Sequence, residues 1–182
     1  MYANLLSAAT QFLTPDLIAK MASASGLDSA AAQKTAGAAV PAILSGLASL
    51  ASSSNGARQL SNVIAEQPQN TLANLADMIG SSTRIADTGK TLLSLLLGGG
   101  ALNTLVSAVA KFAGIGDGSS RSMLGMLAPM VLGILGREQR EGGLNANDLA
   151  QMLASQKDQF VAAMPAGLPE HLNRSGFFDR LG

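Results

Sequence analysis

The sequence predicts an all-α, multihelical fold without a β-sheet, in which one helical unit occurs twice. Alanine and leucine dominate the chain, β-branched residues are sparse, and no stretch alternates as a half-buried strand would. A glycine–proline pattern recurs after 88 residues. Of the 182 residues 47% are hydrophobic but only 3% are aromatic. The core is therefore expected to consist of closely packed helices bearing small and aliphatic side chains.

The tandem duplication is predicted from residue types that set backbone geometry. Gly26, Gly37, Pro41, Leu44 and Leu47 recur in the same order as Gly114, Gly125, Pro129, Leu132 and Leu135. We expect a first repeat over 1–87 and a second over 88–166, packed as one globular domain. The C-terminal tail over 167–182 is expected either to fray or to dock as a short amphipathic element.

Several helix ends follow from local chemistry. Thr14 precedes a proline and an acidic residue, which predicts an N-cap there, and Gly26 is expected to end that helix in a left-handed conformation. Asp28 or Ser29 then opens a long alanine-rich helix. Two further pairs have the spacing of capping boxes, and each is expected to start a helix. These pairs are Asn145 with Asp148 and Ser155 with Asp158.

A proline lies inside the long helix of each repeat, four residues after a glycine. Pro41 follows Gly37, and Pro129 follows Gly125. Because proline removes a helical hydrogen bond and crowds the preceding turn, the pattern predicts a kink or break. Each glycine would also offer a bare surface for another helix. The alternative is a moving hinge at the same four residues.

Thr91 to Ala110 is a run of twenty uncharged residues, long enough to cross a bilayer as one helix. Gly98, its two following glycines and Asn103 interrupt it, so we favour two short buried helices over a membrane-spanning helix and leave contact of this run with lipid open. Thr88 is predicted to cap the first of these helices and Asn103 the second.

Composition argues against several kinds of site. Twelve basic and twelve acidic residues cancel, which argues against nucleic-acid binding, and the absence of cysteine excludes thiolate metal sites and thiol nucleophiles. Gly89-Lys90-Thr91 resembles the end of a phosphate-binding loop, but Arg84 stands where that motif needs glycine. His171 is the only histidine and has no second ligand nearby in the sequence. We therefore expect no metal, no cofactor and no catalytic residue.

The candidate interaction surface lies on the second proline helix. Met123, Met126 and Met130 share one helix face, and Gly133 permits close contact with another helix. Such a stripe is either an adaptable partner surface or core filler. Phe177 and Phe178 in the tail are the second candidate. The N-terminus has no basic residue before its apolar stretch, which argues against a secretory signal. We expect a cytoplasmic protein, with peripheral envelope association left open.

Four segments carry a resemblance to a known family. They are GLDSAAAQKTAGAAVPAILSGLA, GKTLLSLLLGGG, and SMLGMLAPMVLGILG followed by LAQMLASQKDQFVAAMPAGL. In this order, over residues 4–167, the chain resembles the YidB-like family of bacterial proteins of unknown function. The resemblance implies a soluble, multihelical and internally duplicated protein. The family has no established catalytic residues, so the resemblance implies none here.

These observations favour a non-catalytic protein that acts in protein interaction or self-assembly, as a homo-oligomer or with an unknown protein partner. The alternative is a module that binds an apolar ligand or a lipid surface. The third hypothesis is an enzyme whose site is assembled from distant residues.

Overall fold

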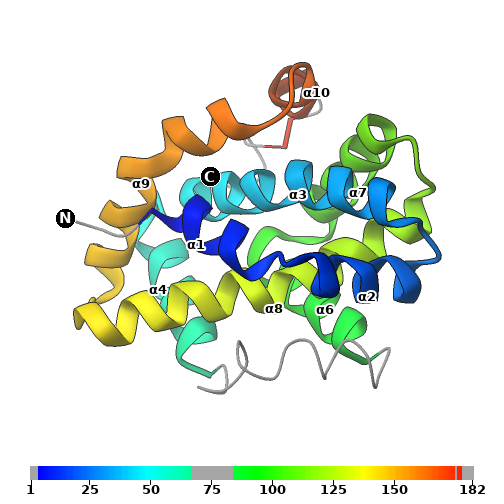
Figure 1. Ribbon diagram of the computed structural model, residues 1–182. Coiled ribbons are helices and arrows are strands. Elements are labelled where there is room, and N and C mark those ends of the chain that lie inside the picture. The colour runs from blue at the N-terminus through cyan, green and yellow to red at the C-terminus, as the bar shows by residue number, and fades with distance from the viewer. Residues whose placement is uncertain (1–3, 67–83, 175, 178–182) are drawn as a thin grey trace.

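The computed structural model describes residues 4–66, 84–174, 176 and 177, and all regular structure in this part of the chain is α-helical. The all-α prediction is confirmed. The helices, labelled as in Figure 1, are α1 (Leu5–Phe12), α2 (Pro15–Ser25), α3 (Ser29–Leu50), α4 (Ser54–Glu66), α6 (Arg84–Leu97), α7 (Gly99–Ala113), α8 (Asp117–Gly142), α9 (Ala146–Ala163) and α10 (Leu168–Arg174).

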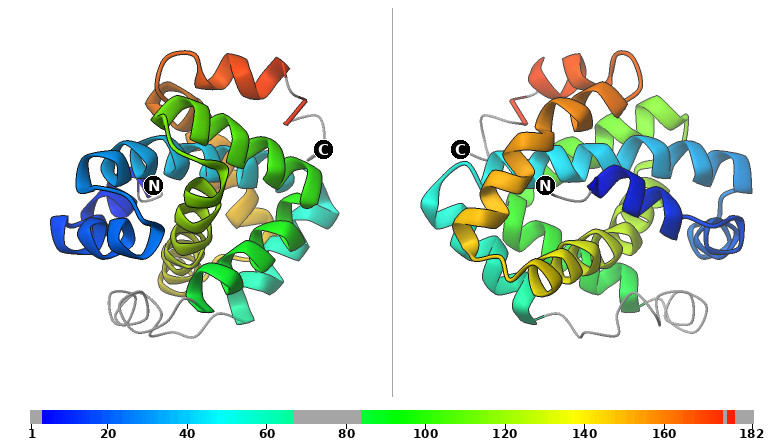
Figure 2. Two further views of the ribbon diagram at one scale, coloured as in Figure 1. Left: turned by 90° about the vertical axis from the view of Figure 1, so that its right-hand side faces the viewer. Right: turned by 60° about the vertical axis from the view of Figure 1, so that its left-hand side comes forward.

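The two helices with a proline in their interior, α3 and α8, form the centre of the molecule (Figures 1 and 2). Helices α1, α2, α4, α6 and α7 pack against α8 or against both central helices, α9 packs on α3 and α4, and α10 lies on α7. Every residue from Ala38 to Leu50 and from Met123 to Gly136 is buried. These stretches are apolar or small on all sides, as expected of helices that are surrounded by other helices.

The two predicted repeats share this core. Helix α2 of the first repeat packs on both α3 and α8, and α7 of the second repeat packs on both α8 and α3. Each repeat therefore covers the central helix of the other, and the described residues form one packed body.

Helix boundaries recur with the spacing of the glycine–proline pattern. Gly26 ends α2 and Gly114 ends α7, each with φ of 70°. The next helix begins three residues after each glycine, α3 at Ser29 and α8 at Asp117. These matching ends agree with a tandem duplication, which stays a prediction from the sequence.

Most of the predicted caps are confirmed. The Thr14 hydroxyl accepts a hydrogen bond from the Leu17 amide at 3.2 Å, and the Asp28 carboxylate accepts one from the Ala31 amide at 2.7 Å. Asn145 forms a capping box at the start of α9. Each cap satisfies an amide that the first helical turn leaves without a helical partner.

Three predicted helix starts are wrong. Helix α9 runs through Ser155, whose hydroxyl donates to the Met152 carbonyl at 2.8 Å. Helix α6 begins at Arg84, before Thr88, and α7 begins at Gly99, before Asn103. Between α6 and α7, Gly98, with φ of 87°, makes the turn within a single residue, so α7 starts directly after it.

A buried glutamine holds the N-terminal helix on α9. Gln156 is 5% exposed, and its side-chain oxygen accepts a hydrogen bond from the Leu5 amide at 2.9 Å. We predict that Gln156→Leu lowers the free energy of unfolding by about 1–3 kcal/mol, because the buried amide loses its acceptor. Urea unfolding followed by circular dichroism measures this loss.

The matched control is Gln151→Leu, five residues earlier on the exposed side of α9. A surface substitution of this kind is expected to change stability by no more than about 0.5 kcal/mol. Equal losses in the two variants would contradict a specific role for the Gln156 contact.

Candidate functional site

The methionines of the predicted interaction surface lie in the core. Met123, Met126 and Met130 are 0%, 1% and 0% exposed, and Gly133 is buried on the same helix. Helices α1, α2, α3, α4, α6 and α7 all pack on α8 and leave no face of its apolar stretch open. The core-filler alternative therefore describes these residues, and the prediction of a methionine surface is corrected.

The proline helices are continuous. Helix α3 runs through Pro41 and α8 runs through Pro129, so neither proline breaks its helix. The kink and the hinge stay predictions. Each proline lacks an N–H and so leaves the carbonyl four residues earlier without its helical donor.

The two glycines that carry these carbonyls have different surroundings. Gly37 is exposed, and a Cβ added to it would meet no atom within 4 Å. Gly125 is buried, and Gly89 of α6 lies directly against its carbonyl group. A Cβ on Gly89 would overlap that carbonyl and lie 2.9 Å from the Gly125 Cα. The bare helix contact predicted from the sequence therefore forms at Gly125 and not at Gly37.

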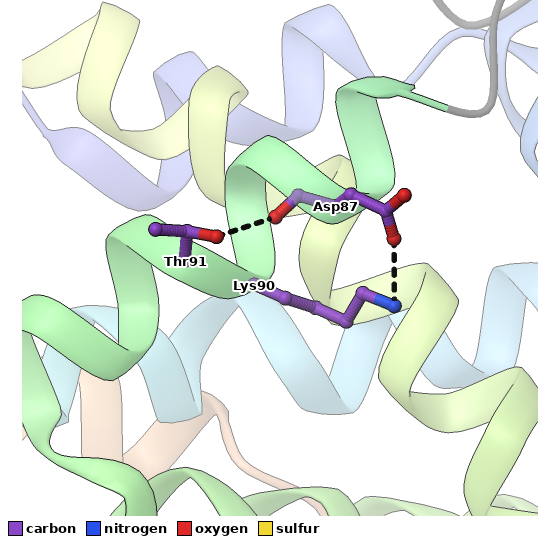
Figure 3. A network of polar contacts seen from close by, with 3 residues as sticks. All are labelled: Asp87, Lys90 and Thr91. Atoms are coloured by element: carbon purple, nitrogen blue, oxygen red, sulfur yellow. Dashed lines mark hydrogen bonds and ion pairs between the residues drawn. The ribbon is translucent and has the colours of Figure 1, made fainter.

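The Gly89-Lys90-Thr91 segment lies within α6 and not in a loop before a helix. The Lys90 ammonium pairs with the Asp87 carboxylate at 3.0 Å, and the Thr91 hydroxyl donates to the Asp87 carbonyl at 3.0 Å (Figure 3). A phosphate-binding loop needs free amides that point at the anion, together with a lysine that can reach it. This arrangement offers neither, so it does not form a phosphate-binding loop.

The long uncharged run is divided between two helices, as predicted. Gly98 separates α6 from α7, and the axes of Asp87–Leu97 and Gly99–Ala113 are bent by 119°. Among the described helices, α8 alone is long and apolar enough by itself to cross a membrane. Of its most apolar window 78% is buried within the fold, and a core helix meets the same criteria. It is therefore weak evidence for a membrane span.

The bend between α6 and α7 carries an exposed leucine that the sequence analysis missed. Leu95 is 56% exposed, the one large hydrophobic side chain that is exposed in the described part of the chain. Its exposed neighbours in the sequence are uncharged. We call this the corner surface, and it comprises Thr91, Ser94, Leu95, Gly98, Gly99 and Gly100. The triple glycine was the sequence signal for a bend, but nothing local distinguished Leu95 from the buried leucines beside it.

The corner surface is supported by buried side chains of α6 and by a hydrogen bond from α4. Leu93, Leu96 and Leu97 are buried, and the side-chain amide of Gln59 in α4 donates to the Leu95 carbonyl at 2.7 Å. A side chain exposed on such a well-packed helix end can contact a partner without prior ordering, which lowers the entropic cost of binding.

The C-terminal segment docks on the fold. Leu168 and Leu172 of α10 are buried, and Phe177 is 0% exposed. A fraying tail is therefore wrong for this segment, and Phe177 faces the core instead of a surface. Phe178 lies outside the described residues.

No metal centre emerges from the described residues, which contain no group of three or more histidine or acidic side chains that could hold an ion. His171 lies in α10, half-buried, and its amide donates to the Gly167 carbonyl at 3.1 Å. The corner surface is the arrangement that remains as a candidate site.

A family model of a bacterial protein of unknown function, DUF937, matches residues 8–138. The YidB-like proteins that the sequence resembles belong to the same family. The match ends within α8, so it covers less of the chain than the resemblance over 4–167. The curated proteins and the solved structures contain no match to the chain. Because the family model spans more than half of the sequence, from α1 to the apolar part of α8, the chain belongs to the DUF937 family of bacterial proteins.

Proposed function

We propose that the protein is a non-catalytic interaction module that associates with a second copy of itself through the corner surface. The exposure of Leu95 supports this proposal, since it is the one large apolar side chain found exposed among the described residues. An exposed apolar group on a rigid helix end gains free energy when a partner covers it.

The lack of charge favours a second copy as the partner. In a two-fold contact each patch faces its own counterpart, so any net charge on the patch repels itself. The chain has no charged residue from Thr91 to Ala110. The three exposed glycines would also allow two backbones to approach closely.

We predict that Leu95→Glu weakens self-association at least tenfold. The substitution removes about 2 kcal/mol of apolar burial per copy and places two like charges opposite each other. Light scattering over a concentration series measures the change. Gln33→Glu is the matched control, because it adds the same charge at an exposed site on α3.

A wild-type protein that stays monomeric at the highest concentration would contradict the proposal, as would equal effects of the two variants.

The second candidate function, contact with a lipid surface, uses the same exposed leucine. Flotation with uncharged phosphatidylcholine vesicles distinguishes the two: recovery with the vesicles that Leu95→Glu abolishes favours the lipid function.

A further inference from the structure

One asparagine of the chain stands directly before a glycine, at the start of α4. Asn55–Gly56 is the single pair of this kind in the sequence. The side-chain amide of an asparagine can be attacked by the backbone nitrogen of the next residue, and a glycine leaves that nitrogen unshielded because it has no Cβ. Asn55 is exposed, so water and base reach its side chain. The pair therefore has the composition and the exposure of a deamidation site.

Packing against the end of α3 requires the glycine of this pair. Gly56 is buried, and a Cβ added to it would overlap the Leu50 carbonyl oxygen and lie 2.8 Å from the Ser53 hydroxyl oxygen. The Leu50 carbonyl belongs to the backbone, so it cannot rotate away as a side chain could. A side chain at position 56 would push α4 away from α3. The close contact of the two helices thus keeps the reactive pair in place.

The same turn holds the Gly56 nitrogen away from the reaction. Its N–H donates a hydrogen bond to the Ser53 hydroxyl at 3.0 Å, and that hydroxyl donates to the Leu50 carbonyl at 3.3 Å. Asn55 lies within α4 and has a helical backbone. Attack requires the Gly56 nitrogen to close a five-membered ring with the Asn55 Cγ, and this ring needs a ψ outside the helical range. The first turn of α4 therefore opposes the reaction while it stays formed.

This turn is the part of α4 that opens most easily. The helix begins at Ser54, one residue before the asparagine, and helix ends fray more readily than helix interiors. A glycine in the turn weakens it further. Opening breaks the hydrogen bond between Gly56 and Ser53, but it does not require Leu60 and the buried side chains beyond it to leave the core.

We propose that Asn55 is a deamidation site that the first turn of α4 protects, and that it reacts when this turn opens. The Gly56 nitrogen attacks the Asn55 Cγ, so that an N–Cγ bond forms and the Cγ–Nδ2 bond breaks. Ammonia leaves with the proton that the Gly56 amide gives up. Water then opens the ring at one of its two carbonyl groups. The net change is the gain of one water and the loss of one ammonia, with no oxidation or reduction.

The two products of ring opening differ in their effect on the fold. Aspartate at position 55 adds a negative charge to the first turn of α4, which the helix dipole favours, and its side chain stays exposed. Isoaspartate places an additional methylene group in the backbone before Gly56. That group moves Gly56 from its position against the Leu50 carbonyl, so the first turn cannot form again as before. One opening of the turn can thus leave a permanent change.

The test measures the rate of deamidation at Asn55 in the full chain. Each protein is kept in mildly alkaline buffer, and mass spectrometry of its peptides follows the conversion of the Asn55 amide into an acid. Ser53→Ala removes the acceptor of the Gly56 N–H and is expected to raise the rate about two- to tenfold, the factor by which loss of one hydrogen bond increases the open population. The wild type unfolded in guanidinium chloride is expected to react at least about tenfold faster than the folded chain.

Two variants serve as controls. Ser53→Thr keeps a hydroxyl at the same place and is expected to react at the wild-type rate, as is Ser52→Ala, since the Ser52 hydroxyl donates to the Ser49 carbonyl instead. A rate for Ser53→Ala no higher than that for Ser52→Ala overturns the proposal, and so do equal rates in the folded and unfolded wild type. The second comparison needs no variant and decides the matter if Ser53→Ala does not fold. Neither depends on self-association through the corner surface.

Discussion

Met126→Glu is expected to lower the free energy of unfolding by about 3–5 kcal/mol or more. Met126 is 1% exposed in a helix that is covered on all sides, so the substitution places a carboxylate in an apolar core. A loss of this size removes a large part of the 5–15 kcal/mol that stabilises an ordinary domain. Urea unfolding measures it, and a chain that fails to fold at all gives the same answer by circular dichroism.

Leu95→Glu is the matched control, because it makes the same apolar-to-acidic change at a side chain that is 56% exposed. Its effect on the stability of the isolated chain is expected to stay within about 0.5 kcal/mol. If Met126→Glu were tolerated as well as Leu95→Glu, the methionines would face solvent, and the original prediction of a methionine surface would be restored.

Gly89→Ala is expected to destabilise the fold by about 2–3 kcal/mol. Alanine favours the helix by about 0.5–1 kcal/mol over glycine, but its methyl group would overlap the Gly125 carbonyl. The overlap involves the backbone of α8, which cannot rotate away as a side chain could. Steric overlap therefore outweighs helix propensity, and α6 has to move away from α8. Thermal unfolding should show a melting temperature lower by about 5–10 °C.

Gly37→Ala separates the steric effect from helix propensity. Gly37 precedes its proline by the same four residues as Gly125, yet a Cβ there meets no atom within 4 Å. This variant is expected to be more stable than the wild type by about 0.5–1 kcal/mol. A loss of stability in both variants would contradict the assignment of Gly89 as the close helix contact.

The helix ends that the sequence predicted correctly depend on chemistry within one turn. Thr14, Asp28 and Asn145 each accept a hydrogen bond from an amide three residues ahead, so local sequence is sufficient to place them. Thr88 and Ser155 have the same local character but lie inside helices. Helix α6 begins before Thr88. Local capping chemistry does not reveal how far a helix extends toward its N-terminus.

The site was harder to predict because burial depends on distant partners. The methionine spacing correctly indicates one helix face, but the helices that cover it come from both repeats. Leu95 stands in a row of leucines, and only the packing of α6 on α8 leaves it outside. The docking of Phe177, in the C-terminal tail, depends on Gly46, which lies in the first repeat and carries no local sign of this role.

The shared covering of the two central helices has a consequence for the order of synthesis. When the ribosome has made α2 and α3, the opposing surfaces on α7, α8 and α9 do not yet exist. The first repeat therefore leaves the ribosome with α3 covered only by α1, α2 and α4, and the complete core forms only after most of the chain has emerged. During that interval the nascent chain exposes the kind of apolar surface that chaperones bind, although the folded chain buries most of the large apolar side chains among its described residues.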